Sequence, residues 1–279
     1  MGFNKIQVEL FYSNLTKLMA DYGFPPSRIY NMDESGITTV PNKIPKVIAA
    51  KGKRSVNKVR SAESGQLITA VCCFSASGHY IPPATLMSGA TPDSVLFVSE
   101  SGYINSEIYM SFLKHFQNHA KANKESPVLL ILDNHSSHCS LDAVLYCRKN
   151  NIDRLTIPPH SSHRTQPLDR CFFKALKDYY GEYCDHWLVN HPGRTITQDN
   201  VAEIFGCAYN KVCTIEKAVN AFRMCGIVPV NKFIFCDEDF LPATVTDQSV
   251  PNEETTHQQI EVEDAFFSRE DDVPLKELP

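Results

Sequence analysis

Three aspartates stand where carboxylates from separate parts of the chain could meet. Asp33 and Asp133 each follow a short apolar run typical of a buried strand, and Asp169 lies two residues after Pro167, which suits the first turn of a helix. Three converging carboxylates could hold two Mg²⁺ ions, the arrangement with which phosphoryl transfer stabilises the attacking and the leaving oxygen. Each aspartate could instead be a cap or turn residue, and Asp169 would then only favour a helix N-terminus.

Two histidine pairs lie beside two of these aspartates. The segment His135-Ser-Ser-His138 follows Asp133, and the segment His160-Ser-Ser-His163 precedes Asp169. Zinc binding is one interpretation, but neither pair encloses the glutamate that serves as the base in zinc peptidases. We favour histidines that hydrogen-bond the carboxylates or a nucleic-acid phosphate, and the alternative is that they only shape their loops.

The apolar pattern predicts the elements that would position these side chains. Apolar runs indicate strands at residues 29–32, 46–50, 66–74, 128–132 and 153–157. Helical spacing indicates helices from Val8 to Met19, after the caps Asn105 and Ser140, from Leu168 to about Leu188, and after Thr197 and Thr214. Because early strands are followed by alternating helices and strands, the sequence predicts a mixed α/β domain.

Charge is distributed unevenly along the 279 residues, whose net charge is −5. From Asp237 onward 13 acidic residues stand against Arg269 and Lys276, a net charge of −11, so the first 236 residues carry +6. A basic body points to a polyanionic partner, although the acidic tail could also be a solubilising appendage on an unrelated domain. From about Thr244 the periodic apolar pattern ends, which predicts disorder.

Composition excludes several classes of protein. The longest apolar runs, such as residues 128–132, fall far short of the roughly 20 residues that a membrane-spanning helix needs. The ten cysteines never occur as C-x-x-C, which argues against a zinc ribbon, and no export signal is apparent at the N-terminus. We therefore expect reduced thiols in the cytosol or nucleus.

Three segments together resemble a known family. They are Ile29-Tyr-Asn-Met-Asp-Glu-Ser-Gly36, Leu130-Ile-Leu-Asp-Asn-His-Ser-Ser-His138 and Ile157-Pro-Pro-His-Ser-Ser-His-Arg-Thr-Gln-Pro-Leu-Asp169, with 35 residues between the second and third aspartates. The chain resembles the DDE-type transposase domain of the pogo, tigger and jerky group, most of all jerky- or tigger-derived proteins. The likeness continues to about Pro229 and departs at Arg170-Cys171, where the family commonly has an apolar residue and glycine.

This resemblance implies an RNase H-like fold, a mixed sheet flanked by helices, with Asp33, Asp133 and Asp169 as the catalytic triad that binds Mg²⁺ or Mn²⁺. It divides the chain into a leading helix at 1–25, the DDE core at 26–190, closing helices at 191–236 and an acidic, largely disordered tail at 237–279. We assign a supporting role to the polar residues nearest the triad, which are Glu34, Asn134, His135, His138, His160, His163 and Gln166.

The resemblance leaves two classes of function open. One is a metal-dependent nuclease and strand-transferase that acts on DNA, and the other is a domesticated protein that binds DNA or chromatin in the nucleus without cutting it. Relatives usually carry helix-turn-helix modules upstream, and we expect none in this chain. The expected partner is DNA, with a homodimer as an additional possibility and no membrane.

A basic segment follows the first of the three aspartates. Seven basic residues and no acidic residue lie between Lys43 and Arg60. Such a run is often only a solvated loop, but here it belongs to the basic part of the chain and could hold phosphates beside the triad. The expected DNA-binding residues are Lys51, Lys53, Arg54, Lys58 and Arg60.

Neutralising Lys51, Lys53 and Arg54 together should weaken DNA binding equally for all sequences and reduce its salt dependence, because phosphate contacts release counterions. Fluorescence anisotropy at two salt concentrations measures both quantities. Unchanged affinity and salt slope in the triple variant would favour the solvated loop.

Overall fold

The computed structural model describes residues 2–38, 67–84 and 104–246, and these contain a five-stranded mixed sheet. The strands are β1 (Ile29–Thr38), β2 (Leu67–Ser75), β3 (Tyr80–Ala84), β4 (Val128–Leu132) and β5 (Ile152–Thr156). Their order across the sheet is β3-β2-β1-β4-β5. The first three strands pair antiparallel, whereas β4 and β5 run parallel to β1. This is the RNase H-like arrangement that the sequence predicts.

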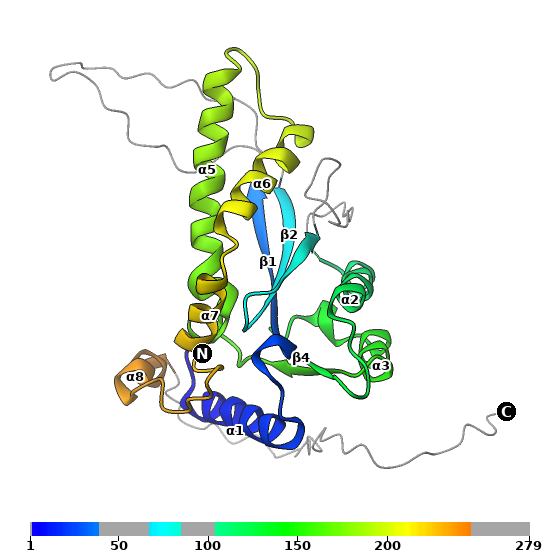
Figure 1. Ribbon diagram of the computed structural model, residues 1–279. Helices are drawn as coiled ribbons and strands as arrows, with labels where there is room; N and C mark the ends of the chain where they lie inside the picture. Colours follow the sequence, from blue (N-terminus) through cyan, green and yellow to red (C-terminus); the bar gives the residue numbers. More distant parts are fainter. Residues whose placement is uncertain (1, 39–66, 85–103, 247–279) are drawn as a thin grey trace, which may run out of the picture. The chain divides into compact units, whose positions relative to one another are not determined.

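Helices cover both faces of the sheet (Figure 1). Apolar residues of α1 (Lys5–Tyr22), α5 (Phe173–Asn190), α6 (Gln198–Val212) and α7 (Ile215–Met224) share one core cluster with one face. Residues of α2 (Ser106–Ala120) and α3 (Leu141–Lys149) form a second cluster with the other face. All five residues of β4 are fully buried, as the continuous apolar run predicts for a strand covered on both sides.

The helix boundaries follow local rules that are visible in the sequence. Asn4, Asn105 and Ser140 cap α1, α2 and α3 by accepting a hydrogen bond from a backbone N–H in the first turn. Gly23 ends α1 with φ of 61°, in the left-handed region where a side chain is strained. None of the helices in the described part of the chain is long and apolar enough to cross a membrane.

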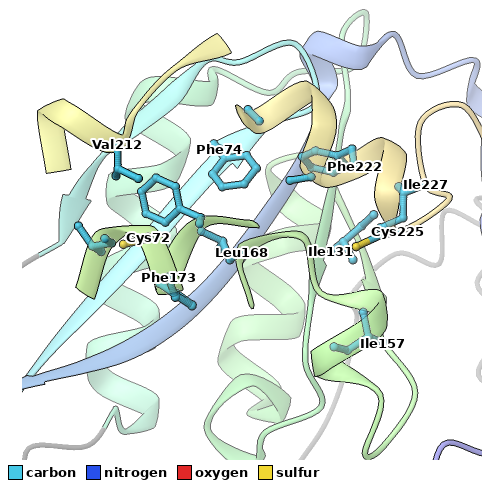
Figure 2. Packing of buried hydrophobic residues seen from close by; sticks show 14 of the residues in the cluster. Cys72, Phe74, Ile131, Ile157, Leu168, Phe173, Val212, Phe222, Cys225 and Ile227 are labelled. Carbon is cyan, nitrogen blue, oxygen red and sulfur yellow. The ribbon is translucent and has the colours of Figure 1, made fainter. Parts of the chain in front are cut away.

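A short irregular stretch joins the sheet to the long helix α5. The helical turn α4 (Ser162–Thr165) is followed by η3 (Leu168–Phe172), a single π-helical turn that runs into α5. Leu168 and Phe172 are fully buried, and Leu168 lies between the sheet residue Phe74 and Phe173 of α5 (Figure 2). The aspartate at the second position of this π turn is therefore fixed against the sheet by its apolar neighbours.

The structure corrects two sequence-based boundaries. β1 does not end near Asp33 but continues to Thr38, because β2 pairs with it along its whole length. The first ten residues of the predicted acidic tail are not disordered, because they form α8 (Asp237–Thr246), and Phe240 is buried in the first core cluster. The predicted strand at 46–50, the basic run 43–60 and residues 247–279 lie outside the described residues.

Two glycines give opposite predictions for the same substitution. Gly23→Ala should lower the free energy of unfolding by about 1–2 kcal/mol, because alanine is strained in the left-handed conformation. Gly181→Ala should raise it by about 0.5–1 kcal/mol, because Gly181 lies inside α5, where the added methyl group would enter open space. Urea denaturation measures both, and a loss of stability in Gly181→Ala would contradict the assignment of α5.

Candidate active site

The strands β1 and β4 are neighbours in the sheet, and each leads to one of two aspartates. Their parallel ladder pairs Ile29 with Leu129 and Asn31 with Ile131, and two further residues along each strand lead to Asp33 and Asp133. Side chains alternate between the faces of a sheet, so both aspartates follow the direction of Ile29 and Ile131. These two isoleucines belong to the cluster that contains the buried residues of η3. The expected adjacency of the two strands is confirmed.

A buried amide pair joins the third aspartate to these strands. Asn31 donates from Nδ2 to the carbonyl of Ile131 at 3.0 Å and to Oε1 of Gln166 at 2.8 Å. Its Oδ1 accepts from the backbone N–H of Leu168 at 3.0 Å, and Gln166 donates from Nε2 to the carbonyl of Met32 at 3.3 Å. Both side chains are fully buried. The start of η3, and with it Asp169, is thereby hydrogen-bonded to β1 and linked to β4.

Two of the three carboxylates sit in an unfavourable electrostatic environment. Burial raises the pKa of Asp33 well above its usual range, and the negative charges of Asp169 and Glu34 raise it further. Burial also raises the pKa of Asp169, and the charge of Asp133 adds to the effect, while Lys177 and His163 oppose it. The negative charge of Asp169 therefore acts on Asp33, and that of Asp133 acts on Asp169.

Asp133 differs because it has a cationic partner. Nδ1 of His138 lies 2.9 Å from Oδ1 of Asp133, and Nε2 of the same ring lies 3.1 Å from Oε1 of Glu34. The side chain of His138 is 1 % exposed, and although burial alone would lower its pKa, the two carboxylates raise it to about 10. Burial raises the pKa of Asp133, but the hydrogen bonds from His138 and from the backbone N–H of His135 outweigh it, so the pKa is lowered overall.

The other predicted supporting residues have smaller or different contacts. Asn134 accepts a hydrogen bond from Cys139 at 3.2 Å and so shapes the loop, and His135 contacts Ser137 at 2.7 Å. His160 is exposed and has a φ of 57°. His163 is exposed, packs its ring edge against Phe3 and acts electrostatically on Asp169.

Sequence reasoning missed Asn31 and Lys177. Asn31 places an amide inside the apolar run Ile29-Tyr-Asn-Met32, and a buried amide needs partners, which is the signal that could have identified it. Lys177 lies eight residues after Asp169, just past the first turn of α5, where a periodicity argument sees only an exposed position. The π turn changes the helical register between Asp169 and Lys177, and no local sequence pattern predicts a π turn.

The donor set suits a hard divalent cation in its chemistry. Carboxylate oxygens are the ligands that Mg²⁺ prefers, and the pKa of Asp33 is raised first by burial and then by the negative charges of Asp169 and Glu34, which a cation would offset. Among the residues that the structure describes, no three His, Cys, Asp or Glu side chains are arranged to hold a metal ion. One of the three carboxylates, that of Asp133, is paired with His138.

Comparison with known families gives one match over most of the core. A family described as DDE superfamily endonuclease matches residues 65–225. A protein of Schizosaccharomyces pombe called CENP-B homolog protein 2 is 25 % identical over 183 residues, 59 % of this chain and 33 % of that protein. The human pogo transposable element with ZNF domain is 22 % identical over 178 residues, 61 % of this chain and 12 % of that protein.

A further relative carries a name of another kind. A Cochliobolus lunatus protein called MFS-type transporter clz9 is 30 % identical over 231 residues, 78 % of this chain but 25 % of that protein. The chain thus spans a third or less of the length of these three relatives. Among solved structures, a Mos1 transposase paired-end complex with left transposon end is similar at 19 % identity and a TM-score of 0.46, covering 79 % of this chain and 63 % of that one.

Replacing Asn31 by leucine should lower the free energy of unfolding by about 1–3 kcal/mol for each buried group left unpaired, namely the amide of Gln166 and the N–H of Leu168. The double variant Asn31→Leu/Gln166→Leu should lose less than the sum of the two single variants, because it removes both partners together. Urea denaturation of the four proteins measures this coupling. Additive losses would show that the pair does not act as a unit.

Proposed function

The chain belongs to the DDE superfamily endonuclease family, as a transposase-derived domain of the pogo type, and on this premise we propose that it binds DNA and cuts its phosphodiester bonds with divalent metal ions. The observation that carries the proposal is that β1, η3 and the end of β4 bring carboxylates into electrostatic reach of one another, Asp33 with Asp169 and Asp169 with Asp133. A mere cap or turn role for each aspartate would not require the buried amide pair that holds η3 against both strands.

In this proposal Asp33, Asp133 and Asp169 are the metal ligands and the catalytic residues. Bound ions would supply activation of the attacking oxygen and stabilisation of the leaving oxygen. The protein's own part is to hold the three carboxylates in place before substrate arrives. Asn31 and Gln166 position η3, and the pair of His138 with Glu34 fixes the direction of Asp133.

Cations beside the triad would receive the substrate's phosphate groups. Lys177 and His163 both act electrostatically on Asp169, and both are exposed. A DNA strand that enters the site must bring its negative charge toward three carboxylates, which is unfavourable without positive charge nearby. We assign to these two side chains, together with bound metal, the role of offsetting the negative charge of the DNA. We assign the nucleus as the compartment in which the protein binds DNA.

The second candidate is a domesticated domain that binds DNA without cutting it. It is favoured by the ion pair of Asp133 with His138, which occupies one carboxylate of the triad. In that case the fold and the net positive charge of the first 236 residues serve binding alone. Metal binding and DNA cleavage can be measured separately, so the two candidates make different predictions.

Asp33→Asn should abolish plasmid nicking in Mg²⁺ or Mn²⁺, because it removes a metal ligand, whereas Asp142→Asn should nick like the unmodified protein. Asp142 is an exposed aspartate of α3, on the opposite face of the sheet, and so controls for the loss of one charge. Gel electrophoresis of supercoiled plasmid measures the nicked fraction. Equal nicking by both variants would exclude Asp33 from the reaction.

Thermal denaturation shows whether metal binds when nothing is cut. Millimolar Mg²⁺ should raise the Tm of the unmodified protein, since a ligand of the folded state alone stabilises it, and Asp33→Asn should lose this increase. Without metal the same variant should be the more stable one at neutral pH, because the raised pKa means that the Asp33 charge destabilises the fold. Metal stabilisation and DNA binding without nicking would favour the domesticated domain.

A further inference from the structure

The first turn of α8 meets the N-terminus and α4 in a cluster of aromatic and charged side chains. Phe3 and Phe240 stack with ring centroids 4.8 Å apart and an interplanar angle of 4°, and Phe235 meets Phe3 edge-on at 5.0 Å. Phe3 and Phe240 are buried. Arg164 of α4 lies over the ring of Phe3, 5.0 Å from its centroid, and pairs with the carboxylate of Asp239. We call these five residues the Arg164 cluster.

The cluster holds the guanidinium of Arg164 in a fixed orientation. The ring of Phe3 lies on one side of it, and that of Phe235 lies 6.0 Å away. The side chain of Arg164 is 26 % exposed, so part of it faces solvent. A guanidinium that is held in this way presents its N–H groups as a rigid fork, which binds a carboxylate and a phosphate with the same geometry.

Arg164 also belongs to the segment that forms the candidate active site. Its neighbour His163 acts electrostatically on Asp169, and Gln166 two residues later is locked to Asn31 on the sheet. The position of Arg164 is therefore tied to that of the triad through a few residues of rigid backbone. The sugar-phosphate backbone of nucleic acid bound at Asp169 would therefore lie near α4.

The acidic partner of Arg164 comes from outside the core of the fold. Asp239 is 75 residues further along the chain, in the first turn of α8, where Asp237, Glu238 and Asp239 follow one another. Asp237 also pairs with Lys5 of α1, with Nζ and Oδ1 2.6 Å apart. The acidic turn thus covers two cations of a body whose first 236 residues carry a net charge of +6.

We propose that Arg164 is a phosphate-binding residue for DNA and that the carboxylate of Asp239 occupies it as an internal substitute for phosphate. DNA must displace Asp239 to reach Arg164, so the first turn of α8 limits DNA affinity. This inference rests on the proposed DNA binding and adds to it the residue that contacts the backbone and the segment that competes for it. The alternative is a structural clamp, in which the ion pair only fastens α8 to α4.

The test compares two neutralising substitutions in one helical turn. Asp239→Asn removes the acid that pairs with Arg164, whereas Glu238→Gln removes an equal charge from an exposed residue that accepts a hydrogen bond from the thiol of Cys236. Binding of a fluorescein-labelled duplex of arbitrary sequence is followed by anisotropy at several salt concentrations. The Phe3–Phe240 stack should keep α8 in place in both variants, and thermal denaturation verifies that each is folded.

We expect Asp239→Asn to bind the duplex about 3- to 10-fold more tightly than the unmodified protein, with a salt slope steeper by about one phosphate contact. Glu238→Gln should change the affinity by less than about twofold, since exposed charges at a distance are screened by salt. The double variant Asp239→Asn/Arg164→Gln should lose the gain. Arg164→Gln alone should have a smaller effect than it has in the Asp239→Asn background.

Four results would overturn the inference. Equal gains in Asp239→Asn and Glu238→Gln would mean that only the total charge matters. An unchanged affinity with a lowered Tm in Asp239→Asn would mean that the ion pair is a structural clamp. Absence of binding by every variant, the unmodified protein included, would count against the proposed function as well, whereas normal binding that no substitution alters counts against the role of Arg164 alone.

Discussion

The buried amide of Asn31 is the contact on which the candidate active site depends. A fully buried side-chain amide must have its donors and its acceptor satisfied, or it costs about 1–3 kcal/mol per unpaired group. Its partners come from β4, from Gln166 and from the start of η3, so one side chain joins β1 to segments that lie 100 residues away or more in the chain. The segments that satisfy this amide also carry or adjoin Asp33, Asp133 and Asp169. A requirement of folding therefore fixes the segments that carry these three aspartates relative to one another.

That place is electrostatically costly, and the surrounding residues offset the cost unevenly. Asp133 is paired with the buried ring of His138, which Glu34 supports from the other side. The pKa of Asp33 is raised instead, by burial and by the negative charges of Asp169 and Glu34. Such an imbalance is typical of functional sites, because a fold selected for stability alone would pair or remove the charge. It is the same imbalance that makes a divalent cation an appropriate ligand.

The C-terminal part of the described chain bears on this charge balance. Phe240 brings the first turn of α8 into the core cluster, and this burial places Asp239 on Arg164 rather than in solvent. An acidic turn fixed by an aromatic stack pairs with particular cations, Arg164 and Lys5, whereas a disordered acidic tail would screen the whole basic body diffusely. The position of Phe240 thus decides which basic residues are covered.

The sequence by itself determined the class of the fold and the helix caps, and it pointed to three aspartates as the candidate site. These features are local: apolar period, capping residues such as Asn105 and Ser140, and motifs of a few consecutive residues are fixed by neighbours along the chain. The length of β1, the π turn at Asp169, the partners of Asn31 and the docking of α8 by Phe240 were decided by tertiary structure. Each depends on a segment far away in the sequence: β2 prolongs β1 by pairing with it, and an amide or an aromatic ring takes whichever partner the fold presents. No local pattern encodes such a partner, because hydrogen bonds and packing contacts are satisfied by proximity in space.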